Sequence, residues 1–200
     1  MRPKAALVDI GNVLLSFDFE SALLRLVPED TSDPLLRVHS LLERKDEFES
    51  GEIAEDEFIS WASGKLDFTG SPGTFRDTWR SIFQPIKPMW EAIAAMKTAG
   101  LRLFLFSNIN VIHGPWVQQT YAVMNLFDGR VFSYEVGSLK PETAIYETAF
   151  QLHNLKPETT LYIDDLPENI ATGRELGLSC HQYDLHNHPA FGSWLTKQLA

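Results

Sequence analysis

Short apolar runs recur along this chain, and each predicts a strand that is buried in a sheet. The runs lie within residues 5–8, 101–106, 131–133 and 160–163, and residues 178–182 are predicted as a fifth strand after the last helix. They are too short for helices, and segments with helical periodicity separate the later ones. Continuous apolar runs of this length are typical of parallel strands with both faces covered. The alternation therefore predicts an α/β fold with a doubly wound parallel sheet.

The predicted helices of this sheet cover residues 88–99, 116–124, 141–152 and 167–176. Pro88 and Pro141 suit a first helical turn, and Gly100 and Gly177 suit the left-handed position that closes a helix. Lys140 therefore stands at a predicted helix N-terminus. A short amphipathic helix is expected around Trp194, packed on the core or on a second subunit, so a homodimer is one possible assembly.

Residues 16–85 differ from the rest because they contain helical patterns and no convincing strand. Four apolar faces at helical spacing, interrupted by turn-forming residues, predict four short helices. We therefore expect a core domain of residues 1–15 and 86–200, and a helical cap domain of residues 16–85 inserted after the first strand.

Composition narrows the class of protein without naming a function. Apolar residues make up 44% of the 200 residues and charged residues 22%, as in ordinary globular proteins. The formal charge of −10 disfavours nucleic acid or an anionic membrane as a partner. A single cysteine and no long apolar stretch lead us to expect a soluble, cytoplasmic protein.

Polar side chains end three of the predicted strands and precede one helix: Asp9, Ser107, Asn108, Lys140, Asp164 and Asp165. Because the carboxyl ends of parallel strands meet at one edge, we expect these groups to converge there. Two adjacent carboxylates repel each other unless they share a cation or a proton. Together with Asp9 they form an oxygen-rich site suited to Mg²⁺.

These motifs, in this order, resemble those of the haloacid dehalogenase (HAD) superfamily, and the resemblance covers the whole chain. The motifs are Asp-x-Gly-Asn-Val from Asp9, Ser107-Asn108, Lys140-Pro141 and Asp164-Asp165. Within the superfamily the chain looks most like the bacterial glucose-1-phosphatase subgroup and, less closely, the N-terminal phosphatase domain of soluble epoxide hydrolase. Residues 48–53, residues 107–110, His113 and Trp116 extend this likeness. The resemblance implies a Rossmann-like core and a cap that closes over the substrate.

The resemblance also implies a role for each motif in a Mg²⁺-dependent phosphatase acting on a small phosphorylated metabolite. Asp9 would attack the phosphoryl group and become an aspartyl phosphate, and Lys140 would neutralise charge. Phosphate oxygens would be held by Ser107, Asn108 and Lys140. The metal would be held by Asp9, the backbone carbonyl of Gly11, Asp164 and Asp165, with Asp165 favoured as the direct ligand. Contacts to substrate or to the metal ligands are expected from Asn12, Asn110, His113 and Asn169, and His113 can alternatively shuttle a proton.

Gly11 departs from the commonest pattern of the superfamily. Most of its phosphatases carry a second Asp two residues after the nucleophile as a general acid, and Gly11 cannot carry a proton. General acid–base help contributes about 10²–10⁴ in rate. Either another group substitutes, or the substrate supplies the proton, or the leaving group departs unaided. We expect a preference for sugar-1-phosphates or acyl phosphates, whose leaving groups need less protonation.

Two other functions fit parts of this pattern. A 2-haloacid dehalogenase also uses a strand-end Asp and also lacks the second acid, but it needs no metal and has no paired carboxylates. A non-catalytic homologue that binds a phosphorylated ligand or a protein partner is favoured only by Gly11. Chelation separates the first alternative from a phosphatase, and binding without turnover identifies the second.

Overall fold

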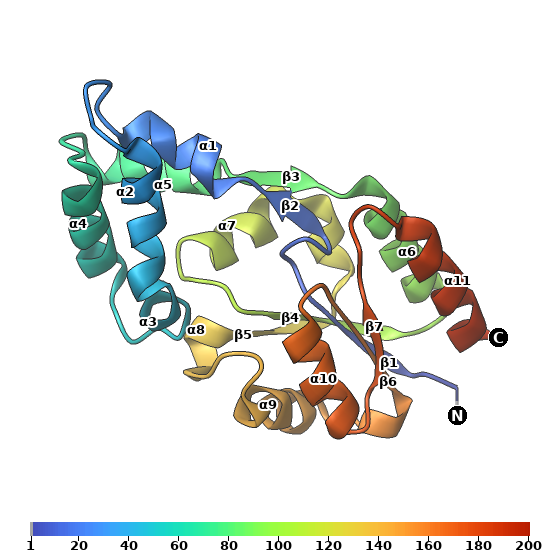
Figure 1. The fold of residues 1–200 in the computed structure, drawn as a ribbon. Coiled ribbons are helices and arrows are strands. Elements are labelled where there is room, and N and C mark those ends of the chain that lie inside the picture. Colours follow the sequence, from blue (N-terminus) through green and yellow to red (C-terminus); the bar gives the residue numbers. More distant parts are fainter. Residues whose placement is uncertain (1) are drawn as a thin grey trace.

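A five-stranded parallel sheet forms the centre of the computed structural model, which describes residues 2–200 (Figure 1). Its strands run in the order β5-β4-β1-β6-β7. Their bounds are β1 (Ala5–Val8), β4 (Arg102–Ser107), β5 (Gly129–Phe132), β6 (Thr160–Asp164) and β7 (Ser179–Gln182). The prediction of an α/β fold with these five strands is confirmed.

Strand β1 lies at the centre of the sheet, so its residues are apolar on both faces. Val8 pairs with Leu105 on one side and with Ile163 on the other. Ala6 and Val8 pack under helices α6 (Lys87–Thr98), α7 (His113–Thr120) and α11 (His188–Leu199). Ala5 and Leu7 pack against α9 (Thr143–His153) and α10 (Pro167–Glu175) on the opposite face (Figure 1). The tail helix α11 thus packs on the core.

The segment between β1 and α6 carries five short helices and a hydrophobic core of its own. We call residues 18–82 the insert. The helices are α1 (Phe19–Leu23), α2 (Pro34–Ser40), α3 (Lys45–Glu49), α4 (Glu55–Leu66) and α5 (Pro72–Arg80). Buried side chains such as Val38, Phe58 and Phe75 make this second core, and Ile112 of the sheet region enters it. A division into two domains at residues 16 and 85 stays a prediction.

The expectation that residues 16–85 contain no strand is wrong at both ends of the segment. Strands β2 (Leu15–Phe17) and β3 (Phe83–Pro85) form an antiparallel pair, in which Phe17 faces Phe83. Each strand has three residues, and its partner lies far away in the chain, so neither has an alternating pattern long enough to recognise. The pair joins the insert to the sheet (Figure 1).

Several predicted element boundaries also need correction. Helix α9 begins at Thr143, so Lys140 and Pro141 lie in the preceding loop and not at a helix N-terminus. The amide side chain of Asn108 holds the backbone of Lys140 in that loop, which competes with a helical start. Ser133 belongs to α8 (Ser133–Val136) rather than to β5, and its hydroxyl bonds to the backbone N–H and carbonyl of Ile109.

The predicted helix over residues 116–124 is in fact two elements. Helix α7 is followed by a 3₁₀ turn at Ala122–Leu126. Further 3₁₀ turns lie at Leu24–Leu26, Leu41–Arg44 and Pro157–Thr159. No helix within residues 2–200 combines the length and the apolar character needed to cross a membrane.

Candidate active site

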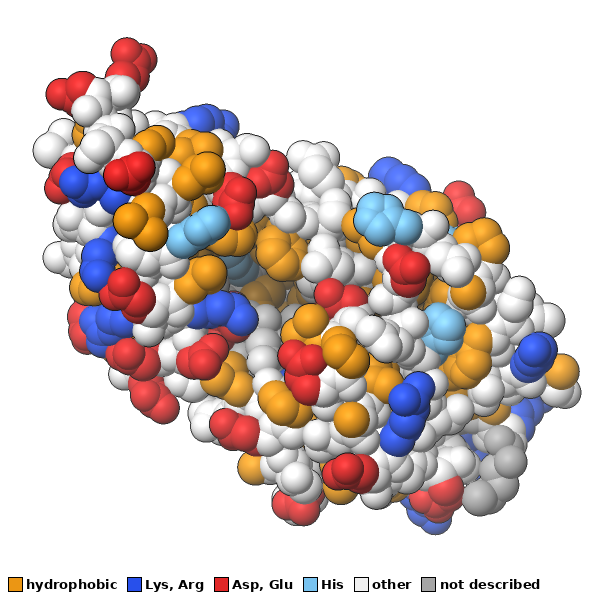
Figure 2. Space-filling view, in the orientation of Figure 1, with side chains coloured by type: hydrophobic (Ala, Val, Ile, Leu, Met, Phe, Trp, Pro, Cys, Tyr) orange, Lys and Arg blue, Asp and Glu red, His pale blue; other side chains and the backbone are white. Residues whose placement is uncertain are grey.

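The carboxyl ends of β1, β4 and β6 face a cavity of about 470 Å³ that lies between the sheet and the insert. Asp9, Ser107, Asn108, Lys140 and Asp165 all line it. Figure 2 shows the hollow between the insert on the left and the sheet region on the right. The convergence expected from the strand ends is therefore present, and the cavity has the size of a small-molecule site.

Three carboxylates cluster at this edge and could hold a cation. Asp9, Asp164 and Asp165 each offer an oxygen, and these oxygens lie within 4.8 Å of one another. The backbone N–H of Asp9 donates to the carbonyl of Ile163 at 3.0 Å, which extends the pairing of β1 with β6 by one residue. The parallel register of these strands therefore places the three acids together.

A buried ammonium group neutralises part of this charge. The Nζ atom of Lys140 lies 2.6 Å from Oδ2 of Asp164 and 3.0 Å from Oδ1 of Asp9. It also donates to the carbonyl of Phe106 at 3.0 Å. Burial alone would lower the pKa of Lys140, but the carboxylates of Asp164 and Asp9 outweigh it and raise the pKa above its ordinary value. Lys140 is therefore a fixed cation beside Asp9.

The carboxyl group of Asp9 is under opposing influences. Burial raises its pKa above the ordinary value, Lys140 opposes this, and Asp164 adds to it. The hydroxyl of Ser107 also lowers the pKa of Asp9. The carboxyl is 7% exposed and lines the cavity, so a ligand there can reach it. A cation beside Asp9 would favour its ionised form.

Asp164 and Asp165 have different surroundings, although they are adjacent. Asp164 is fully buried and accepts from Lys140, from the hydroxyl of Tyr162 at 2.7 Å, from Asn169 at 3.0 Å and from a backbone N–H at 2.9 Å. Burial opposes ionisation, but Lys140 and the other donors prevail and lower the pKa of Asp164. Most of the hydrogen-bonding capacity of its two oxygens is therefore used by donors within the protein.

The side chain of Asp165 accepts fewer hydrogen bonds than that of Asp164. It is partly exposed, and its Oδ2 accepts from the side-chain amide of Asn12 at 3.1 Å. Burial raises the pKa of Asp165, an effect that Asn12 opposes. The geometry thus makes Asp165, together with Asp9, the better candidate for direct contact with a metal ion, while Asp164 positions Lys140.

The side-chain amide of Asn108 bonds within the protein, and the expected contact of Asn108 with a phosphate stays a prediction. Oδ1 of Asn108 accepts from the backbone N–H of Lys140 at 2.8 Å, and its Nδ2 donates to the carbonyl of Lys140 at 2.9 Å. The amide is therefore engaged on both sides and clamps the backbone of Lys140. Ser107 lines the cavity wall next to Asp9.

His113 is not suited to shuttle a proton, because protein groups occupy both ring nitrogens. Its Nδ1 lies 3.2 Å from the amide nitrogen of Asn110, which can only donate, so the proton is on Nε2, which donates to the carbonyl of Trp79 at 3.1 Å. Burial lowers the pKa of His113 to about 3. Asn110 in turn accepts from the backbone N–H groups of Ile112 and His113 at the start of α7. His113 lines the cavity and ties α7 to the insert.

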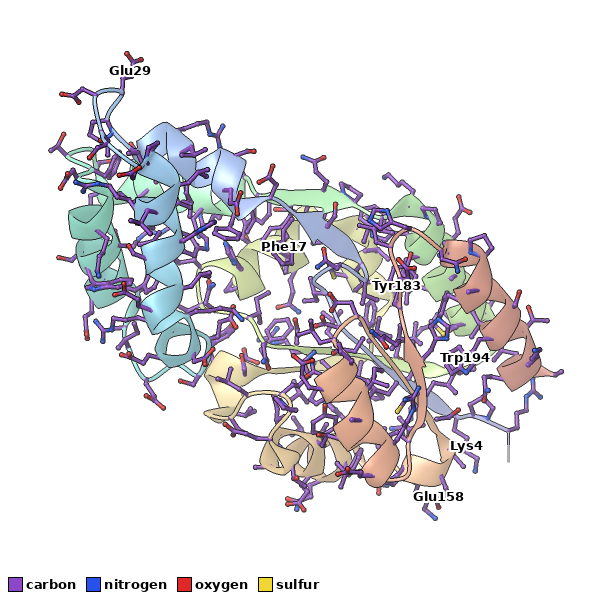
Figure 3. All side chains as sticks on the ribbon, in the orientation of Figure 1. Lys4, Phe17, Glu29, Glu158, Tyr183 and Trp194 are labelled. Atoms are coloured by element: carbon purple, nitrogen blue, oxygen red, sulfur yellow. The ribbon has the colours of Figure 1, made fainter. Side chains whose placement is uncertain are left out.

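Gly11 and Asn12 form the turn after β1, and they differ in backbone conformation and in the contacts they make. Asn12 adopts a left-handed φ of +50° and carries its amide to Asp165. Gly11 does not have a left-handed φ, and a Cβ there would lie 3.2 Å from the ring of Phe17 and 3.9 Å from Oδ2 of Asp9. The ring of Phe17, labelled in Figure 3, projects from β2 over this turn.

The insert and its two flanking strands give the cavity an apolar wall. Its members share aromatic or aliphatic side chains: Phe17, Phe19, Leu41, Leu42, Phe48, Phe58, Trp79, Ile82 and Phe83. Lys45 and Glu49 are the charged residues on this side. Phe48 lines the cavity, whereas Trp116 stacks on Phe83 outside the cavity lining. Residues from five separate segments meet in this wall, which no local pattern could reveal.

Comparison with known proteins agrees with this geometry. The sesquiterpene phosphatase astK of Aspergillus oryzae is 25% identical over 179 residues, covering 88% of this chain and 87% of that protein. The D-ribitol-5-phosphate phosphatase of Bacteroides thetaiotaomicron is 24% identical over 191 residues, covering 90% and 91%. Both relatives are phosphatases, and each match spans nearly the whole chain.

A solved structure has the same fold. A HAD family enzyme from Bacteroides thetaiotaomicron, crystallised in complex with magnesium and inorganic phosphate, superposes with a TM-score of 0.78 at 22% identity, covering 92% of this chain and 95% of that one. The family model described as haloacid dehalogenase-like hydrolase matches residues 3–177. This match includes β1, the insert and the ends of β4 and β6. The chain belongs to the haloacid dehalogenase-like hydrolases.

Proposed function

We propose that this protein is a Mg²⁺-dependent phosphatase that hydrolyses a small phosphomonoester through an aspartyl phosphate on Asp9. The observation that carries the proposal is the placement of Asp9 at the cavity wall, 3.0 Å from the ammonium of Lys140 and within 4.8 Å of two further carboxylates. A carboxylate attacks phosphorus only when the phosphoryl charge is screened. The phosphatase relatives support this reaction class.

The carboxylate cluster has the chemistry that a magnesium site needs. Mg²⁺ prefers one or two carboxylates together with phosphate oxygens and water. Asp9 and Asp165 would hold it, with the carbonyl of Gly11 as a further ligand, while Asp164 keeps Lys140 in place. When bound, the ion would screen the charge of the phosphoryl group. The complex of a solved relative with magnesium and phosphate supports this choice of metal.

The chain's own residues would carry out two displacements. An oxygen of Asp9 attacks phosphorus, and the bond from phosphorus to the leaving oxygen breaks. Lys140 holds Asp9 in line and stabilises the charge that develops on the phosphoryl oxygens, with help from the hydroxyl of Ser107. Water then attacks the aspartyl phosphate and restores the carboxylate.

The cavity favours an organic group with apolar surface. Nine aromatic or aliphatic side chains form the wall opposite Asp9, and aromatic faces bind such groups by dispersion and by exclusion of water. A relative that acts on a sesquiterpene phosphate supports this choice. The second candidate is a sugar-1-phosphate, which Gly11 favours, or a polyol phosphate, which the ribitol-5-phosphate phosphatase favours. Assignment to the glucose-1-phosphatase subgroup stays a prediction, as does closure of the insert as a cap.

Phosphate release from a substrate panel tests the proposal directly. The panel holds geranyl phosphate, glucose-1-phosphate, ribitol-5-phosphate and acetyl phosphate, each with Mg²⁺ and with EDTA. We expect Mg²⁺-dependent release that falls by about 10³–10⁶-fold in Asp9→Asn, because the nucleophile is lost. Asp77→Asn is the matched control, since the Asp77 side chain is 81% exposed.

Each rival function predicts a different result in this assay. Chloride release from 2-chloropropionate that persists in EDTA would identify a dehalogenase. Phosphate binding without release from any compound would identify a non-catalytic homologue. Preference for glucose-1-phosphate over geranyl phosphate would contradict the apolar substrate class while leaving the phosphatase reaction intact.

A further inference from the structure

The proposed reaction needs a proton donor in the cavity, and Gly11 has no side chain that could serve as one. An alkoxide leaving group needs a proton as its bond to phosphorus breaks. Beyond the carboxylate cluster and Lys140, three residues of the described cavity wall have side chains that exchange protons: Lys45, Glu49 and His113. Both nitrogens of His113 are already engaged, and burial lowers its pKa to about 3. This leaves the two residues of α3.

Glu49 is the better placed of these two. Its side chain is 15% exposed, whereas that of Lys45 is 50% exposed. Oε2 of Glu49 is buried and has no hydrogen-bond partner among the described residues, and the nearest cation is Nζ of Lys45 at 3.5 Å. A buried carboxyl oxygen without a donor favours the protonated form or a ligand that completes it.

The charged groups around Glu49 act in both directions. Burial raises its pKa, Lys45 on the same helix lowers it, Asp46 raises it, and Lys140 at the sheet edge lowers it. Together these effects raise the pKa of Glu49 above its ordinary value. Glu49 and Lys140 line the same cavity, and Lys140 is one of the charges that act on the pKa of Glu49.

Helix α3 packs against the sheet region, and this contact fixes the position of Glu49. Gly51 follows the helix with a left-handed φ of +79°. A Cβ at Gly51 would lie 2.6 Å from the carbonyl oxygen of Tyr134 in α8, a distance that only glycine allows. The end of α3 therefore packs directly on α8 (Figure 1).

We propose that Glu49 is the general acid and base of the phosphatase reaction, in place of the missing acid at position 11. The proposal rests on the proposed function. In the first step Asp9 bonds to phosphorus, the P–O bond to the leaving group breaks, and the leaving oxygen takes the proton of Glu49 to form the alcohol. In the second step water bonds to phosphorus, Glu49 takes one proton of that water, and the bond from phosphorus to Asp9 breaks.

The dependence of the rate on the leaving group tests this role. Glu49→Gln keeps the size of the side chain and removes the acid. We expect its kcat/KM to fall by about 10²–10⁴-fold on an alkyl phosphate. On p-nitrophenyl phosphate we expect a change below about threefold, because that leaving group departs without a proton. A burst of p-nitrophenol should appear in the variant, because water attack on the aspartyl phosphate loses its base.

Controls separate this proposal from a folding defect and from failure of the proposed function. Glu52→Gln, on the exposed surface of the same segment, should match the wild type. Glu49→Asp should recover part of the activity on the alkyl phosphate. An equal loss on both substrates, or no loss on the alkyl phosphate, would overturn the role of Glu49. Absence of Mg²⁺- and Asp9-dependent turnover in the wild type would instead reject the proposed function.

A second measurement needs no variant and therefore no assumption about folding. Ring-substituted phenyl phosphates keep one shape while the pKa of the leaving group changes. With Glu49 as the acid, the wild-type kcat/KM should depend only weakly on that pKa. A steep dependence would show that the leaving group departs unaided, as Gly11 alone suggests, and would contradict the proposal.

Discussion

The role of each residue in this site depends on which of its hydrogen-bonding groups are already used within the protein. Asp164 and Asp165 carry identical side chains, but four donors occupy Asp164 and one reaches Asp165. Asn108 likewise holds the backbone of Lys140 through both ends of its side-chain amide. Residue type and order predicted that these groups would meet, and the partners of each group decide what it can do there.

His113 provides a prediction at the residue scale, because it is buried as a neutral imidazole. Its pKa of about 3 in the folded protein lies below the value of 6.5 expected for an unfolded chain. Between these values the unfolded state binds more protons than the folded state, so stability falls as the pH falls from about 6.5 towards 3. The free energy of unfolding should drop by up to ~1.4 kcal/mol per pH unit from this residue.

Urea unfolding between pH 6.5 and 5 measures this dependence, in a range above the titration of most carboxyl groups. The slope of the unfolding free energy against pH should be smaller in His113→Gln than in the wild type. His186→Gln, at an exposed position, should retain the wild-type slope. Equal slopes in the wild type and His113→Gln would contradict a neutral, buried His113.

Whole elements are placed by contacts that link distant parts of the chain. Strands β2 and β3 pair across the entire insert, and α3 ends against α8 through Gly51. In the insert, four of the five helices were predictable from apolar spacing, because each buries one face in a local core. Helix α3 was missed, because it has five residues and only Phe48 is buried. The strand pair and the docking of α3 were not predictable, because their partners lie more than 60 residues away.

Gly51 and Gly64 make a matched pair for a test at the element scale. At Gly51 a Cβ would meet a backbone carbonyl in a left-handed conformation, whereas at Gly64, inside α4, it would meet nothing within 4 Å. Gly51→Ala should cost more than about 1–2 kcal/mol of unfolding free energy. Gly64→Ala should stabilise the protein by about 0.5–1 kcal/mol, because alanine favours a helix.

Urea unfolding gives both values, and phosphatase assays add a functional readout. Gly51→Ala should also lower activity, because a displaced α3 carries Glu49 away from the sheet edge. If Gly51→Ala matched Gly64→Ala in stability, the close contact between α3 and α8 would not exist in solution.

At the scale of the whole molecule, metal binding should be coupled to folding. The carboxylate cluster joins the ends of β1 and β6, whose residues Asp9 and Asp165 are 156 positions apart, and it assembles only in the folded chain. A ligand that binds only the folded state stabilises it by about 2.7 kcal/mol at a hundred times its Kd. Mg²⁺ should therefore raise the Tm of the wild-type protein.

Thermal unfolding of wild type and Asp165→Asn, with and without Mg²⁺, tests this coupling. The variant should lose most of the Mg²⁺-dependent rise in Tm. Without the metal its Tm should be no lower than that of the wild type, because burial already disfavours the charge on Asp165. The same rise in Tm in both proteins would place the metal elsewhere.

The sequence by itself determined the α/β class, the five strands, and the set of polar groups that converge at one sheet edge. Buried parallel strands leave continuous apolar runs, and the ends of such strands meet at one edge whatever the details of packing. The absence of an acid at Gly11 followed from the resemblance to the HAD superfamily. These features depend on residues close in sequence or on the direction of strands.

Only the tertiary structure decided which role each residue of the site can have. The clamp of Asn108 on Lys140, the different partners of Asp164 and Asp165, and the neutral state of His113 all depend on groups that other segments supply. The same holds for the apolar wall and for Glu49, which line the same cavity as Asp9 because the insert packs beside the sheet edge. Burial and hydrogen-bond partners are properties of the packed molecule, so no local pattern contains them.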